Sequence, residues 1–169
     1  PFVAIPRTPF WCFPRMIEIR NLSKSFGAFT AVDDVSFQVR PGEVLGFLGP
    51  NGAGKSTTMK MITGFLGASK GTVLVCGNDV EKSPREVKSR IGYLPEGAPL
   101  YPDMTPESLL RFVGEMRGLR GSRLTQRIQE VIDLVHLEDV RNQRIETLSK
   151  GFKRRVGLAQ AIVHDPEVL

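Results

Sequence analysis

Eight residues constrain the fold of this chain more than any other segment. They read Gly49-Pro-Asn-Gly-Ala-Gly-Lys-Ser56 and match the pattern GxxxxGK[ST]. A continuous apolar run at residues 44–48 precedes them, and a helical pattern at residues 55–65 follows. A buried strand, a glycine-rich loop and a helix in this order are the context in which the pattern forms a phosphate-binding loop. The sequence therefore predicts an α/β fold organised around an anion site.

The chemistry of the loop indicates a nucleoside triphosphate as its ligand. Its glycines allow close backbone approach, so that successive N–H groups face an anion at the positive end of the following helix. Lys55 would reach the β- and γ-phosphates, and Ser56 would offer its hydroxyl to Mg²⁺. The loop alone fits a GTPase, a small kinase or a transport ATPase. The residues that we expect to bind the nucleotide are Gly49, Pro50, Asn51, Gly52, Ala53, Gly54, Lys55, Ser56 and Thr57.

Composition excludes several other classes of protein. The chain has 169 residues, of which 41% are hydrophobic and 24% charged, as in ordinary globular domains. No apolar run is long enough to span a bilayer. Cys12 and Cys76 are too few for a disulfide framework, which favours a reducing compartment, and we expect Cys76 to be buried. The net charge of +5 is modest for a nucleic-acid binder, although six cations gather between Arg141 and Arg155.

Strand patterns dominate the first half of the chain and helical patterns the second. Residues 16–22, 35–39, 72–76 and 91–94 predict strands in addition to 44–48, and a short helix should begin at Ser83-Pro84. Three helices should follow, one capped by Thr105, one at residues 124–135 and one that begins near Ser149. The pattern predicts an α/β domain with an inserted helical subdomain at approximately 104–150.

Three further segments, together with the loop, make residues 16–169 similar to the nucleotide-binding domain of ATP-binding cassette (ABC) transporters. Within that family the chain resembles the subset that serves bacterial exporters. They are Ser-Lys-Ser-Phe26-Gly, Ile91-Gly-Tyr-Leu-Pro-Glu96 and Leu148-Ser-Lys-Gly-Phe152. The resemblance implies a P-loop NTPase (RecA-like) core with an N-terminal antiparallel β-subdomain and an inserted α-helical subdomain. It also implies ATP and Mg²⁺ as cofactors.

The resemblance assigns roles to Phe26 and Glu96. An aromatic residue at the position of Phe26 stacks on adenine in the family. Glu96 stands where the family has a glutamine that touches Mg²⁺ and the attacking water and links to the membrane partner. A carboxylate can bind Mg²⁺ but donates no hydrogen bond when ionised, so the resemblance implies a metal role for Glu96, beside Ser56, and leaves the positioning of water open.

The segment 148–152 resembles the family's LSGGQ signature. It departs at Lys150 and Phe152, whereas Leu148, Ser149 and Gly151 match. In the family this segment binds ATP held by a partner domain, so the resemblance implies a head-to-tail dimer. The cations in the first turn of the helix oppose its dipole, and two interpretations stay open. Either a phosphate relieves the repulsion, or the side chains of Lys153, Arg154 and Arg155 extend into solvent.

The family also implies partners and a location. We expect transmembrane permease subunits as partners, no nucleic acid, and a cytoplasmic position at the inner face of the membrane, with coupling of ATP hydrolysis to export. Soluble cassette ATPases of translation or repair remain the alternative class. Repair types carry long coiled coils between loop and signature, and no sustained heptad pattern fills that interval here.

The family's core strand that ends in Asp-Glu, and its later histidine, do not occur in this sequence. We therefore interpret the chain as a fragment that lacks C-terminal core strands, binds ATP and has no complete catalytic set. The corresponding alternative function is that of a truncated chain that binds ATP without hydrolysing it. Residues 1–15 are proline-rich and are interpreted as a flank, with Met16 as the natural start.

Overall fold

The computed structural model describes residues 16–169, which divide into two compact units. The first unit ends at Val87 and the second begins at Lys88. The proposed flank, residues 1–15, and Cys12 within it lie outside the described residues. Cys76 is half-buried in a turn rather than buried.

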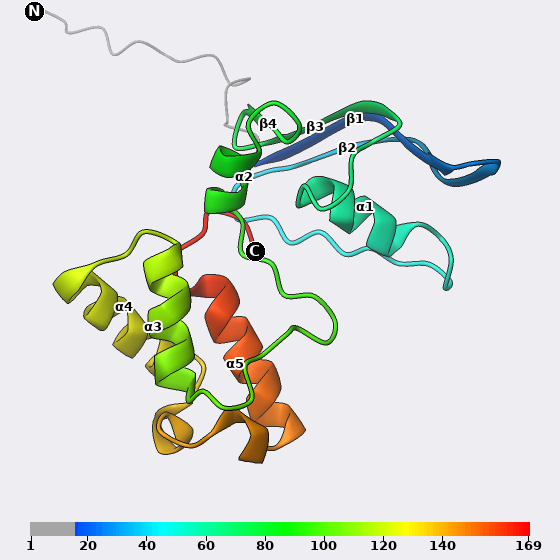
Figure 1. Cartoon of the computed structure of the whole chain (residues 1–169). Helices are drawn as coiled ribbons and strands as arrows, with labels where there is room; N and C mark the ends of the chain where they lie inside the picture. The colour runs from blue at the N-terminus through cyan, green and yellow to red at the C-terminus, as the bar shows by residue number, and fades with distance from the viewer. Residues whose placement is uncertain (1–15) are drawn as a thin grey trace, which may run out of the picture. The chain divides into compact units, whose positions relative to one another are not determined.

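An antiparallel sheet with the strand order β2-β1-β3-β4 forms the first unit (Figure 1). The strands are β1 (Ile17–Phe26), β2 (Phe29–Val39), β3 (Lys70–Val75) and β4 (Asn78–Asp79). A two-residue turn joins β1 to β2, and Phe26 lies directly opposite Phe29. Helix α1 (Lys55–Ile62) contacts β2 and β3 and buries Met61 and Ile62. The antiparallel β-subdomain that the family resemblance implied is thus present.

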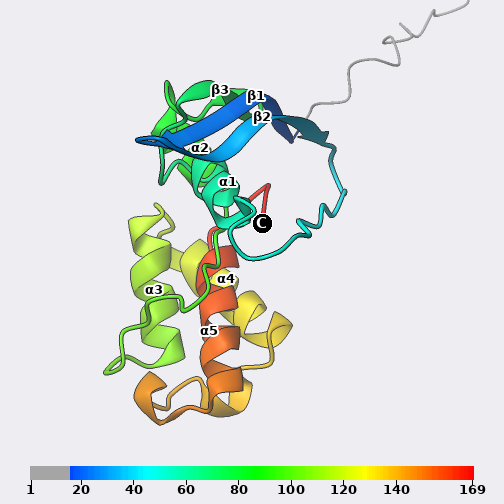
Figure 2. The ribbon, with the colours of Figure 1, turned by 90° about the vertical axis from the view of Figure 1, so that its right-hand side faces the viewer.

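The buried strand predicted at residues 44–48 is wrong for this structure. The segment is irregular, and Val44 and Leu48 are 96% and 97% exposed. Figure 2 shows it as a loop between β2 and α1, and its Phe47 ring packs edge-on against Phe37 of β2 with 5.5 Å between the ring centroids. An apolar run forms a buried strand only when neighbouring strands accept its backbone hydrogen bonds. None of the four strands in the described sheet pairs with residues 44–48.

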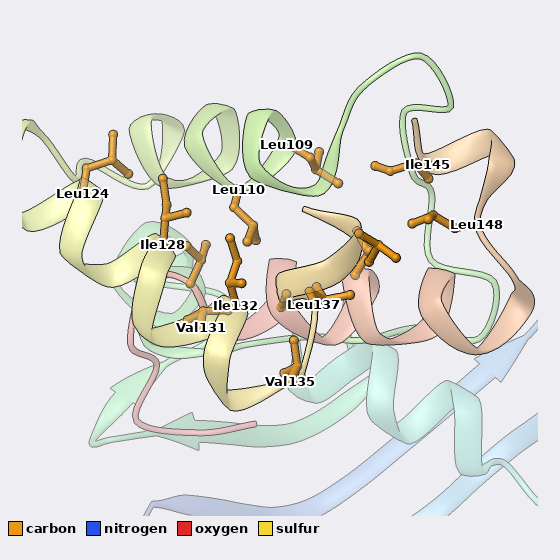
Figure 3. Packing of buried hydrophobic residues seen from close by; sticks show 14 of the residues in the cluster. Leu109, Leu110, Leu124, Ile128, Val131, Ile132, Val135, Leu137, Ile145 and Leu148 are labelled. Atoms are coloured by element: carbon orange, nitrogen blue, oxygen red, sulfur yellow. The ribbon is translucent and has the colours of Figure 1, made fainter. Parts of the chain in front are cut away.

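Three main helices and a shared core form the second unit. They are α3 (Pro106–Met116), α4 (Gly121–Leu134) and α5 (Lys150–Ile162), with the 3₁₀ turns η1 (Glu138–Val140) and η2 (Ile145–Thr147) between α4 and α5. Leucine, isoleucine and valine side chains from these elements interlock in the core (Figure 3). The Thr105 hydroxyl accepts a hydrogen bond of 3.2 Å from the Ser108 N–H and caps α3 as predicted.

The boundary between the units falls within α2 (Pro84–Arg90). The strand predicted at residues 91–94 is not formed as such. In its place the structure has one isolated parallel bridge, between Ile91 and Val168. No helix in residues 16–169 has the length and apolar character that crossing a membrane requires.

His164 makes the stability of the second unit depend on pH. Its Nε2 lies 3.1 Å from the Ile91 carbonyl oxygen. Burial lowers the pKa of His164, and the charges of Arg117 and Arg127 lower it further. The unfolded chain, in which histidine has its ordinary pKa of about 6.5, therefore binds the proton more tightly than the folded chain.

We accordingly expect the free energy of unfolding to fall as the pH drops below the unfolded-state pKa of His164. Urea denaturation of the His164→Gln variant should show a flatter dependence between neutral and mildly acidic pH. The matched control is His136→Gln, since the His136 side chain is 79% exposed. Equal pH dependence in the unmodified chain and the His164→Gln variant would contradict this account.

Candidate functional site

The first unit contains a cavity of about 290 Å³ that joins the predicted phosphate loop to two aromatic side chains. It brings Phe26 to the same cavity as the loop, although more than twenty residues separate them in the chain. The lining residues are Phe26, Phe29, Ala31, Asn51, Gly52, Gly54, Lys55, Ser56 and Thr57. An apolar end and a polar end within one cavity match the two ends of a nucleotide.

Gly54 fixes the position of the loop against the sheet. Its φ is +79°, in the left-handed region that favours glycine. A β-carbon at this position would clash with the backbone carbonyl oxygen of Ala31 in β2. The requirement for glycine therefore lies in a close approach of two backbone segments, and this approach places the start of α1 beside β2.

The first turn of α1 suits an anion. Gly54 provides no side-chain cap, and no acidic residue lies in that turn, so the helix N-terminus keeps its N–H donors and its positive dipole end. The Lys55 ammonium donates to the carbonyl oxygens of Gly49 and Pro50, at 2.7 and 2.6 Å, and thereby closes the loop on itself. Ser56 is exposed at the cavity. These residues fit a polyphosphate with its counter-cation.

Phe29 is a site residue that sequence reasoning missed. Its side chain is 62% exposed and lines the cavity together with Phe26. The signal was present in the sequence, because a two-residue hairpin turn after Phe26 puts Phe29 directly opposite it, and opposed residues share one face of a sheet.

In the second unit, Ser149 caps the N-terminus of α5. Its hydroxyl accepts a hydrogen bond of 3.3 Å from the Phe152 N–H. Ser149, Lys150 and Gly151 are exposed, whereas Leu148 is buried in the helical core and Phe152 is partly buried. The helix begins where the sequence predicted, with the polar part of the segment at the surface.

Two cations near this helix N-terminus donate hydrogen bonds to backbone carbonyl oxygens. Lys153 donates to the Glu146 carbonyl oxygen at 2.9 Å, and Arg155 donates to that of His136 at 3.2 Å. Of the two interpretations left open, extension into solvent does not describe Lys153, which is partly buried, whereas Arg155 stays exposed beside its acceptor. Lys150 and Arg154 are exposed, with no hydrogen bond or ion pair of their side chains within residues 16–169.

Glu96 is exposed and lines a second cavity, of about 770 Å³, within the second unit. The same cavity is lined by Lys150, Lys153 and Arg154. Sequence reasoning did not anticipate that these cations share a cavity with Glu96. Helix α5 lies close to the segment that contains Leu94 and Glu96, since a β-carbon on Gly157 of α5 would lie 3.0 Å from the Leu94 side chain. Among the described residues, no three His, Cys, Asp or Glu side chains gather as a metal site.

Comparison with known proteins identifies the family. The model of the ABC transporter family matches residues 32–169, most of the chain. The chain belongs to the ABC transporter family. The linearmycin resistance ATP-binding protein LnrL of Bacillus subtilis is 40% identical over 91% of the chain. The Nod factor export ATP-binding protein I of Paraburkholderia xenovorans is 39% identical over 90%.

A solved structure confirms the fold class of this family member. The structure of an ATP binding subunit of an ABC transporter is 30% identical, covers 89% of this chain and 63% of its own, and superimposes with a TM-score of 0.81. The chain is thus an α/β protein with part of the P-loop NTPase fold. It spans about half the length of the two curated relatives, 50% in each case.

Proposed function

We propose that this chain is the nucleotide-binding part of an ABC transporter subunit and that it binds ATP with Mg²⁺. The observation that carries the proposal is the cavity that places Phe26 and the N-terminus of α1 at one site. An aromatic ring suits a base, and the helix N-terminus with Lys55 suits a polyphosphate. Membership of the family supports the same ligand.

We assign the binding roles by position around the cavity. Phe26 stacks on the base, and the backbone N–H groups of residues 49–54 face the phosphates. When the nucleotide binds, the Lys55 ammonium exchanges the carbonyl oxygens of Gly49 and Pro50 for phosphate oxygens as hydrogen-bond acceptors. The new hydrogen bonds are stronger, because phosphate oxygens are charged. Ser56 is the proposed Mg²⁺ ligand at this cavity, and the metal role of Glu96 that the resemblance implies is kept as a separate proposal. The metal neutralises phosphate charge when bound.

The exposed N-terminus of α5 is the second proposed nucleotide contact. The segment Leu148, Ser149, Lys150, Gly151 and Phe152 would close over ATP held by a partner domain in a head-to-tail dimer. Exposure of Ser149, Lys150 and Gly151 supports this role, as does the absence of an acidic residue in the first turn of α5. Lys150 and Arg154 add positive charge for the partner's phosphates.

For the whole protein we propose export driven by ATP hydrolysis, through transmembrane permease subunits at the cytoplasmic face of the membrane. The names of two relatives, which refer to linearmycin resistance and to Nod factor export, support export over import. We propose no nucleic-acid partner.

The 169-residue chain itself is proposed to bind ATP without turning it over. Hydrolysis needs a carboxylate or equivalent group that positions water. Among the described residues that line the nucleotide cavity, Lys55 is the only charged one. A general base would therefore have to come from outside this cavity.

The test is an equilibrium titration of the purified chain with ATP in the presence of Mg²⁺, followed by a phosphate-release assay. Saturable binding without release is the expected result. A folded chain that binds no ATP would overturn the proposal, and turnover at about 1 per second or faster would overturn the non-hydrolytic part. For the whole protein, co-fractionation with membranes supports the transporter, whereas co-fractionation with ribosomes or DNA supports a soluble cassette ATPase.

A further inference from the structure

Lys24 occupies one face of the Phe26 ring. The two residues are two positions apart in β1, so their side chains lie on the same side of the strand. The Lys24 ammonium nitrogen is 5.3 Å from the ring centroid, a distance at which the cation is attracted by the negative face of the ring. A planar base can therefore stack only on the opposite face of Phe26.

The ammonium group is itself held in place. It donates a hydrogen bond of 2.7 Å to the carbonyl oxygen of Gly67, in the loop that connects α1 to β3. Lys24 is half-buried, whereas the Phe26 side chain is 50% exposed. A backbone carbonyl thus anchors the cation, and the anchored cation lies against an aromatic ring that is half-exposed.

We propose that Lys24 is a positioning residue for the nucleotide base and that it acts through Phe26. It holds the ring in the orientation in which the ring lines the cavity, so that less side-chain freedom is lost when a base stacks on it. The inference rests on the proposed binding of ATP and extends it from the aromatic residue to the cation behind it.

The proposal predicts a loss that depends on the base. Lys24→Met keeps the aliphatic stem and removes the charge. It should weaken ATP binding about three- to fivefold and leave the binding of inorganic tripolyphosphate unchanged. Lys24→Arg, which keeps a cation and a donor, should restore most of the affinity for ATP. In a Phe26→Ala background, Lys24→Met should have no further effect on ATP binding.

Equilibrium titrations of both ligands, with thermal melts to verify folding, test this prediction. Lys82→Met is the matched control, because the Lys82 side chain is 84% exposed and should leave both affinities unchanged. Equal losses for ATP and tripolyphosphate would overturn the proposal, since they would mean a general effect of charge. An unchanged ATP affinity in Lys24→Met would overturn it as well. Failure of the unmodified folded chain to bind ATP would instead overturn the proposed function and this inference with it.

Discussion

The Lys55→Ala variant should bind ATP about a hundredfold more weakly than the unmodified chain. The ammonium group of Lys55 is the only charged group among the described residues that line the nucleotide cavity. Its present acceptors are two neutral carbonyl oxygens, at 2.7 and 2.6 Å. Hydrogen bonds to charged groups are worth about 1.5–3 kcal/mol each, so the loss of contacts to the phosphates accounts for the expected size.

A lysine on the same helix provides the control for this experiment. Lys60 lies in the last turn of α1 and is exposed, so Lys60→Ala removes the same charge from the same element away from the cavity. Its ATP affinity should stay within about twofold of the unmodified chain, because exposed charges are screened by solvent and salt. Comparable losses in both variants, or none in Lys55→Ala, would contradict the role given to Lys55.

The parts of the structure that the sequence predicted are those with local causes. Thr105 caps α3 and Ser149 caps α5 through hydrogen bonds to residues three positions later, so both helix starts can be found within a short window of sequence. The loop at residues 49–56 likewise has a local pattern with a physical mechanism. Both helix starts are present as expected, and the loop precedes α1 as expected, but an irregular segment stands where a strand was expected before the loop.

The features that sequence reasoning missed depend on residues far apart in the chain. An apolar run at residues 44–48 predicts burial, but burial as a strand also needs neighbours on both edges, which no local pattern reveals. The cavity shared by Glu96 and Lys150 depends on how the segment after Ile91 packs against α5. Phe29 is the exception, because a hairpin of known turn length would have placed it opposite Phe26.

The Leu110→Ala variant should lower the free energy of unfolding of the second unit by about 3 kcal/mol. Leu110 is fully buried in the helical core, where it lies beside side chains of α4 (Figure 3). Truncation removes buried apolar surface and leaves a cavity that the surrounding helices fill only in part, and buried leucine-to-alanine changes cost about 2–5 kcal/mol. Urea denaturation followed by far-ultraviolet circular dichroism measures the change, since α3, α4 and α5 all belong to this unit.

Leu134→Ala is the chemically identical control on α4, because the Leu134 side chain is 65% exposed. It should change the free energy of unfolding by less than about 0.5 kcal/mol, since little apolar surface returns to water. The comparison separates burial from the helix propensity of the two residues, which both variants change alike. Similar effects in the two variants would mean that the core of the second unit is not packed as the structure has it. ATP affinity measured below the onset of unfolding should be unchanged in both, because the nucleotide cavity belongs to the first unit.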